Sequence, residues 1–120
     1  MAYIPMKLNL SAQELALILV KRSPCRIKMA AVLHDRKGIF SYGWNSSGYD
    51  GMGQHAEEHA IGRANKNRLK GATVTIAGRG RKPVCSFPCA DRCLSLILKK
   101  GIKRIVWQDA DGDWNVSPGV

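Results

Sequence analysis

The chain has 120 residues, and its 19 Lys and Arg against 9 Asp and Glu give a formal net charge of +10 at pH 7. Hydrophobic residues make up 45% and charged residues 23%, which is typical of a globular protein and excludes a disordered or fibrous one. The length predicts one domain over residues 1–120. The positive charge favours an anionic partner such as a nucleotide, a nucleic acid or an anionic lipid.

Periodicity and turn residues predict eight elements. Ser11 and Glu14 have capping-box spacing and open the first helix, which Ser23-Pro24 ends. In chain order we expect a helix over residues 11–22, strands over 28–34 and 39–44, a helix over 55–69, a strand over 72–77, a helix over 89–100, and strands over 102–107 and 113–116.

This order predicts an α/β fold in three layers, α/β/α, with a mixed five-stranded sheet and helices on its faces. Few residues follow Trp107, and a parallel crossover needs a dozen or more, so the last strand is expected to be antiparallel. The residues expected to face the core from the later helices are Ala56, Ala60, Ile61, Ala64, Leu69, Leu94, Ile97 and Leu98.

No targeting or membrane segment is visible in the sequence. The N-terminus lacks a cationic start followed by an apolar run, and the longest apolar run, residues 15–20, is far shorter than the ~20 residues of a membrane span. We therefore expect a cytoplasmic protein without a membrane partner. In such a protein, clustered cysteines are more often ligands or catalytic groups than disulfides.

Two short clusters carry residues suited to a metal. The first is Gln54-His55-Ala56-Glu57-Glu58-His59-Ala60 and the second is Phe87-Pro88-Cys89-Ala90-Asp91-Arg92-Cys93. One imidazole and two thiolates suit Zn²⁺, and a fourth position left to water makes such a site catalytic. On a regular helix His55 and Glu57 are about 200° apart, so they converge on one metal only if His55 lies at or before the helix start.

The pairing of H-x-E with P-C-x3-C resembles the zinc-dependent cytidine and deoxycytidylate deaminase superfamily. Residues 22–33 look like the opening strand of deoxycytidylate deaminases, and residues 101–106 look like the strand after the family's cysteine helix. The resemblance covers roughly residues 12–116. It implies that His55, Cys89 and Cys93 bind zinc, and that Glu57 transfers protons while cytosine becomes uracil with release of ammonia.

The resemblance also suggests substrate contacts. Asn45 matches the family asparagine that binds the sugar or the ring edge of the base, and Ala56 and Pro88 adjoin the predicted ligands. Arg26 and Lys28 are candidates to hold a phosphate, which favours a (deoxy)cytidine monophosphate. Relatives usually assemble as homo-oligomers, so at least a dimer is expected.

Other substrates and one other class of function stay open. A free nucleoside is one alternative. Cytosine in a single-stranded polynucleotide is another, with its backbone bound by Arg79–Lys82 together with Lys66, Arg68 and Lys70. The third is a zinc-bearing nucleic-acid-binding module without activity. Tyr42, Trp44 and Tyr49 are candidates to stack on a base.

Four rival interpretations of the clusters concern other ligand sets. His55, Glu58 and His59 fit the inverted zinc-protease motif H-x-x-E-H, which leaves the cysteines unused. Cys85 is an alternative zinc ligand, or it could form an iron–sulfur site together with Cys89 and Cys93. If it is neither, Cys85 is expected to be a small core residue. Cys25 is expected to be a buried thiol. A purely structural zinc site would require a fourth protein ligand.

Overall fold

The computed structural model describes residues 11–47, 53–82 and 84–118. Its centre is one five-stranded sheet of order β2-β1-β3-β4-β5. β1 is antiparallel to both β2 and β3, β3 and β4 are parallel, and β5 is antiparallel to β4. The predicted mixed sheet and antiparallel last strand are therefore confirmed. The strands are β1 (Lys28–Asp35), β2 (Gly38–Trp44), β3 (Thr73–Arg79), β4 (Arg104–Gln108) and β5 (Trp114–Pro118).

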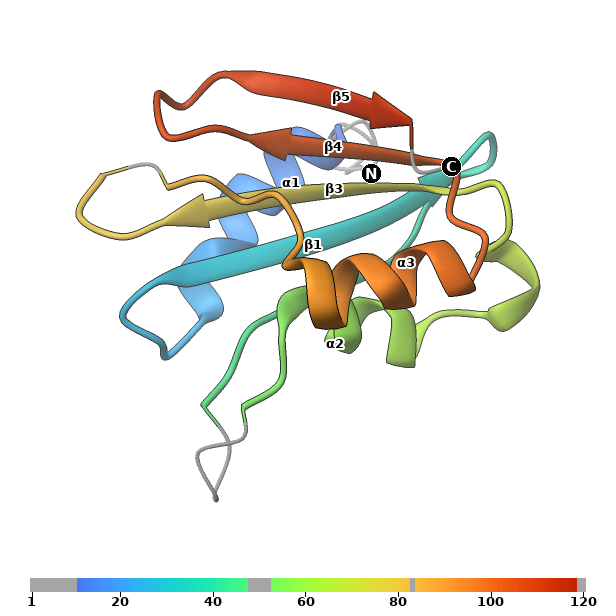
Figure 1. Ribbon diagram of the computed structural model, residues 1–120, viewed down its shortest axis with the longest axis horizontal. Coiled ribbons are helices and arrows are strands. Elements are labelled where there is room, and N and C mark those ends of the chain that lie inside the picture. The colour runs from blue at the N-terminus through green and yellow to red at the C-terminus, as the bar shows by residue number, and fades with distance from the viewer. Residues whose placement is uncertain (1–10, 48–52, 83, 119–120) are drawn as a thin grey trace, which may run out of the picture.

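Helices cover both faces of the sheet, which gives the predicted three layers (Figure 1). On one face lies α1 (Ala12–Leu19), continued by the 3₁₀ turn η2 (Val20–Arg22). On the other lie α2 (Ala56–Arg63), the π-helical turn η4 (Ala90–Leu94) and α3 (Ser95–Lys99). Each face has its own apolar core, one beneath α1 and a larger one beneath α2 and α3. Among the described residues, no helix is both long and apolar enough to cross a bilayer.

The α1 boundary follows from its capping box. Ser11 Oγ accepts from the Glu14 backbone N–H at 3.0 Å, while the Glu14 carboxylate accepts from the Ser11 N–H at 2.8 Å. These two bonds satisfy donors that the first helical turn leaves without partners. The predicted start of the first helix is confirmed.

The predicted helix over 55–69 is too long. α2 ends at Arg63, because Ala64 has an extended backbone and the Asn65 side chain accepts from the Asn67 N–H to cap the 3₁₀ turn η3 (Lys66–Arg68). A short amide side chain competes in this way with helical hydrogen bonds. Ala64 and Leu69 are nevertheless buried, as expected.

The predicted helix over 89–100 begins with a wide turn. The Leu94 N–H donates to the Cys89 carbonyl at 2.9 Å, a bond that spans five residues instead of four. Ile97 is buried as expected, but Leu98 is 39% exposed, so its predicted core position is wrong. Leu96 packs against the core in its place, because the wide turn shifts the buried face of the helix.

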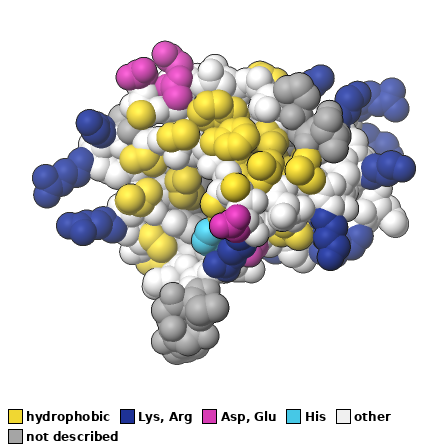
Figure 2. Space-filling view, viewed as in Figure 1, with side chains coloured by type: hydrophobic (Ala, Val, Ile, Leu, Met, Phe, Trp, Pro, Cys, Tyr) yellow, Lys and Arg dark blue, Asp and Glu magenta, His cyan; other side chains and the backbone are white. Residues whose placement is uncertain are grey.

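The two ends of the sheet are both positively charged, as Figure 2 shows by the Lys and Arg side chains at each end of the long axis. We call the end where β1 begins and β3 finishes the cysteine end, and the other the opposite end. Arg79–Lys82 lie at the cysteine end and residues 66–70 at the opposite end, separated by the length of β3, roughly 20 Å at ~3.3 Å per residue. A polynucleotide bound by both segments would therefore have to span the length of β3.

Candidate active site

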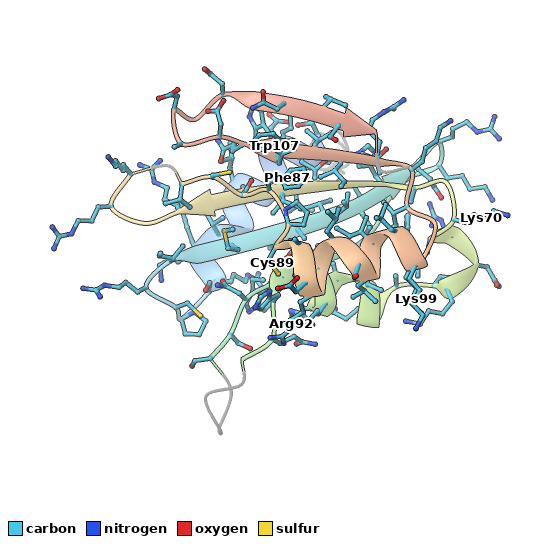
Figure 3. The ribbon with its side chains drawn as sticks, viewed as in Figure 1. Lys70, Phe87, Cys89, Arg92, Lys99 and Trp107 are labelled. Atoms are coloured by element: carbon cyan, nitrogen blue, oxygen red, sulfur yellow. The ribbon has the colours of Figure 1, made fainter. Side chains whose placement is uncertain are left out.

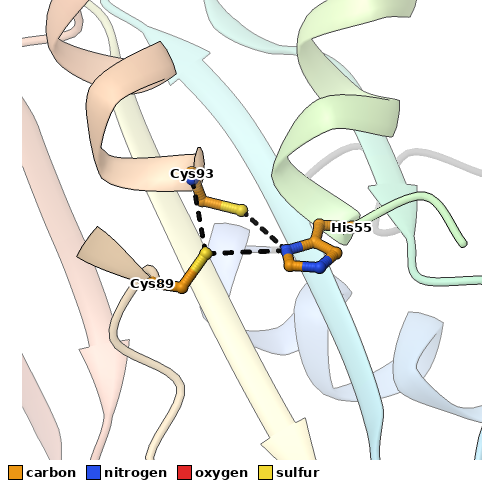
Figure 4. A group of neighbouring side chains, drawn as sticks. All are labelled: His55, Cys89 and Cys93. Atoms are coloured by element: carbon orange, nitrogen blue, oxygen red, sulfur yellow. Dashed lines mark hydrogen bonds between the residues drawn. The ribbon is translucent and has the colours of Figure 1, made fainter. Parts of the chain in front are cut away.

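The predicted metal ligands converge at the cysteine end, although they come from two distant segments. A His55 nitrogen and the sulfurs of Cys89 and Cys93 all lie within 4.8 Å of one another. His55 Nδ1 is 3.0 Å from Cys93 Sγ and 3.8 Å from Cys89 Sγ (Figure 4). Tetrahedral zinc with its usual bond lengths places such N and S atoms about 3.6 Å apart. The donor types and their spacing therefore fit zinc.

His55 is the N-cap of α2, with φ −78° and ψ 156°. Its backbone is thus extended rather than helical. The angle of about 200° that would separate residues i and i+2 on a regular helix therefore does not apply to His55 and Glu57. This confirms the condition that the sequence set for the two residues to converge. The Glu58 carboxylate accepts from the His55 backbone N–H at 2.9 Å and fixes the start of the helix there.

The two cysteines differ in their surroundings. Cys89 is the exposed N-cap of η4, and its sulfur accepts from the Cys93 N–H at 3.4 Å. Cys93 is 1% exposed, and burial, followed by the nearby negative charge of Glu57, raises the pKa of its thiol. A divalent cation beside this sulfur would instead favour its deprotonated form, because zinc binds the thiolate.

Glu57 is the buried carboxyl group of the site. Its residue is 5% exposed, and burial raises the pKa of its carboxyl. Hydrogen bonds from its own backbone N–H and from the Cys93 thiol only partly offset that effect. A buried carboxyl with a raised pKa beside metal ligands is suited to transfer protons.

A hollow of about 170 Å³ opens in front of these groups. This volume equals roughly five or six waters at ~30 Å³ each, the scale of a single heterocyclic ring. Besides the three ligands and Glu57, it is lined by Met29, Asn45, Ala56 and Phe87. Phe87 packs edge-on against Trp107 with ring centroids 5.2 Å apart, which holds the apolar wall in place (Figure 3).

Asn45 lines the hollow and also anchors the segment before β1. Its Oδ1 accepts from Ser23 Oγ at 2.6 Å and from the Met29 N–H at 2.8 Å, while its Nδ2 donates to the Ile27 carbonyl at 2.9 Å. An amide nitrogen carries two N–H donors, so one of them remains for a molecule in the hollow.

Of the other predicted substrate contacts, only Ala56 lines the hollow. Arg26 lines a neighbouring hollow with Gly80, Arg81 and Lys82, while Lys28 Nζ donates to the Ser23 carbonyl at 2.7 Å and the Cys25 carbonyl at 3.0 Å. Pro88 is buried immediately before Cys89 and does not line the hollow.

Several rival ligands are placed elsewhere. His59 Nδ1 lies 3.2 Å from the backbone nitrogen of Trp44 at the sheet edge, so the zinc-protease interpretation is wrong. Cys85 is exposed and lies outside the ligand group, which contradicts both its predicted core position and the iron–sulfur interpretation. Cys25 is half-buried rather than buried. Among the described residues, no fourth His, Cys, Asp or Glu joins the group, unlike in a closed structural zinc site.

The predicted stacking aromatics do not line the hollow either. Tyr42 and Trp44 pack against the core beneath α1, where the Arg63 guanidinium lies 4.7 Å from the Tyr42 ring centroid. Tyr49 lies outside the described residues. The residues that sequence reasoning missed are Met29 and Phe87; the only available signal for Phe87 was its position directly before Pro88-Cys89.

Comparisons with known proteins agree with this geometry. A family model described as the cytidine and deoxycytidylate deaminase zinc-binding region matches residues 6–109. No curated protein is similar enough to match.

Two solved structures share the fold. Cytidine deaminase from Burkholderia pseudomallei has a TM-score of 0.69 at 19% identity, over 90% of each chain. RibD from Acinetobacter baumannii has a TM-score of 0.56 at 20% identity, over 78% of this chain and 25% of RibD. With the family model covering most of the sequence and the ligands converging as its zinc site requires, the chain belongs to the cytidine and deoxycytidylate deaminase zinc-binding family.

Proposed function

We propose that this protein hydrolyses cytosine to uracil and ammonia in a (deoxy)cytidine monophosphate. The observation that carries the chemistry is the buried Glu57 carboxyl beside three zinc ligands and an open hollow. When bound to His55, Cys89 and Cys93, zinc lowers the pKa of water to about 7 and so supplies a nucleophile at neutral pH.

Glu57 moves the protons in this scheme. Its carboxylate accepts one proton from the attacking water and delivers it to the ring nitrogen. It then accepts the water's second proton, from the hydroxyl formed on C4, and gives it to the amino group, which leaves as ammonia while the C4 carbonyl forms. Burial keeps bulk water from competing for these protons and raises the pKa of the carboxyl toward the working pH. The reaction balances as cytosine plus water giving uracil plus ammonia.

The walls of the hollow orient the base. Met29 and Phe87 provide apolar surface for the ring, and the remaining Asn45 N–H is available to an acceptor on the sugar or the base. The Asn45 side chain is held by its three hydrogen bonds, so little conformational entropy is lost when it binds the substrate.

The positive surface beside the hollow supports a phosphorylated substrate. Arg26, Arg81 and Lys82 line one hollow at the cysteine end, and none of them forms an ion pair with another described residue. A localised group of cations suits one phosphate. The cations at residues 66–70 lie across the sheet, so there is no continuous described track for a polynucleotide backbone.

A panel of substrates tests this proposal. The zinc-loaded protein is incubated with cytidine, deoxycytidine, CMP, dCMP and single-stranded DNA, and uracil products are quantified by chromatography. We expect turnover of CMP or dCMP with the highest kcat/KM, and none by Glu57→Gln. Turnover of adenosine substrates only would contradict the cytosine assignment. Salt-dependent DNA binding without any uracil would favour the inactive binding module.

A further inference from the structure

Arg92 connects the two segments that carry the zinc ligands. It lies on the wide turn η4 between Cys89 and Cys93, and it points toward α2 (Figure 3). Its Nε donates to Glu58 Oε2 at 2.6 Å, and its Nη2 donates to Glu58 Oε1 at 2.7 Å. The same Nη2 donates to the Gly53 carbonyl at 2.8 Å, just before the His55 segment.

Glu58 completes the connection to the histidine. The oxygen that accepts from Arg92 Nη2 also accepts from the His55 backbone N–H, at 2.9 Å. One carboxylate therefore contacts the backbone of the histidine ligand and a guanidinium that lies between the two cysteine ligands. A forked guanidinium–carboxylate contact fixes relative orientation as well as distance.

The turn that carries the cysteines is wider than a regular helical turn. Its Leu94–Cys89 bond spans five residues, so the extra residue between the cysteines widens the turn beyond a regular α-helical one. α3 is short, Ser95–Lys99, and adds little rigidity of its own. Arg92 ties this turn to the start of α2 from the outer side.

We propose that Arg92 and Glu58 form a positioning pair that sets the separation between His55 and the two cysteines and thereby determines zinc affinity. The inference rests on the zinc site proposed above. The pair touches neither the reacting atoms nor the metal and acts through the ligands. Groups that orient metal ligands in this way typically change metal affinity or activity by about 10- to 100-fold when mutated.

The fold provides a matched control. Arg68 and Asp35 form a second forked ion pair at the opposite end, with Arg68 Nε and Nη2 at 2.8 and 2.6 Å from the two carboxylate oxygens. The side chains of that pair are 29% and 23% exposed, against 42% and 22% for Arg92 and Glu58. Both ion pairs link segments that are distant in the sequence, but only Arg92–Glu58 links the two segments that carry the zinc ligands.

Zinc dissociation constants of the purified full chain test the proposal, measured by competition with a chromogenic chelator for wild type, Arg92→Met, Glu58→Gln and Arg68→Met. We expect Arg92→Met to raise the zinc Kd about 10- to 100-fold, Glu58→Gln to raise it less because an amide oxygen still accepts from His55, and Arg68→Met to leave it unchanged. The absorption spectrum of the Co²⁺-substituted protein should shift for Arg92→Met alone.

The possible results distinguish failure of the positioning role of Arg92 and Glu58 from failure of the zinc site itself. Equal zinc Kd values for Arg92→Met, Glu58→Gln and wild type would overturn the positioning role while leaving the proposed function intact. A wild-type chain that binds no zinc, or a Cys89→Ser variant that binds it as tightly as wild type, would refute the zinc site and the positioning pair together. Should Arg92→Met fail to fold, Arg92→Lys retains the charge without the fork and is expected to weaken zinc binding as well.

Discussion

The two ends of the sheet resemble each other in charge and differ in burial. Each end has exposed Lys and Arg side chains (Figure 2). Each end also has a forked Arg–carboxylate pair and a hollow. At the opposite end the hollow is lined by Asp35, Arg36, Lys37, Lys70 and Gly71, none of which is buried. Within the described part of the chain, only the cysteine end places a buried carboxyl, Glu57, beside converging metal ligands.

This difference in burial indicates that a buried titratable group, rather than surface charge, identifies the candidate active site. Surface charge attracts an anion to either end, but a proton-transfer group needs a pKa moved by its surroundings, and burial is what moves it. Lys70 and Lys99 lie far from Cys89 in the fold (Figure 3).

Removal of zinc is expected to have the largest effect. Cys93→Ser replaces a buried ligand sulfur, so the protein should bind zinc far more weakly and lose measurable deamination. Metal content by atomic emission and uracil formation are measured on the same samples. Cys85→Ser, outside the ligand group, should keep both. Full activity of metal-free wild type would contradict zinc dependence.

Loss of the buried carboxylate ranks next. Glu57→Gln keeps the shape of the side chain but cannot carry a proton. Turnover should therefore fall below detection while zinc stays bound, because one positioned acid–base group contributes about 10²- to 10⁴-fold and Glu57 carries every proton transfer. Asp35→Asn, the same kind of change at the opposite end, should leave kcat unaltered. If zinc content fell together with activity in Glu57→Gln, Glu57 would be a ligand rather than the proton carrier.

Charge reversal at each end sharpens the comparison. Arg81→Glu with Lys82→Glu removes cations beside the hollow, so the KM for dCMP should rise about tenfold, the size of one charged hydrogen bond, and the effect should shrink at high salt. Lys70→Glu with Lys103→Glu makes the same charge change at the opposite end and should leave this KM unchanged. Equal KM increases in both double variants would mean that net charge, not its location, governs binding.

The smallest effect concerns stability at the opposite end. Hydrogen bonding to Arg68 lowers the pKa of Asp35 to about 2, below its value of about 3.9 in an unfolded chain. The stabilising contribution is therefore present above pH ~4 and is lost as the pH falls toward 2. Thermal unfolding of wild type and Asp35→Asn at pH 5, 4, 3 and 2 should show two Tm curves that approach each other as the pH falls. A gap that stayed constant would contradict the depressed pKa.

The sequence predicted the sheet and the zinc site well, since both depend on local patterns. Strand periodicity and the short C-terminal segment were enough to predict the antiparallel β5. H-x-E and P-C-x3-C were enough to predict the ligands that converge. The convergence itself required His55 to lie outside the helix, a condition that could be stated from the spacing and was then met.

Features that depend on tertiary contacts were missed. The π turn at η4 could not be predicted, because a four-residue cysteine spacing also fits a regular helix turn, and it displaced Leu98 from the core. The Arg92–Glu58 pair joins residues 34 apart in sequence, and each looked like an ordinary surface charge. The separation of the two basic segments by the length of β3 could not be predicted either, because it follows from how the strands pair.

The most direct test of the central claim is the ratio of kcat/KM for dCMP to that for deoxycytidine, measured on the zinc-loaded protein. The account predicts a ratio well above one that falls toward one in the Arg81→Glu, Lys82→Glu variant, with all turnover abolished by Glu57→Gln. Turnover of deoxycytidine equal to that of dCMP in wild type, or uracil formation that survives Glu57→Gln, would contradict it.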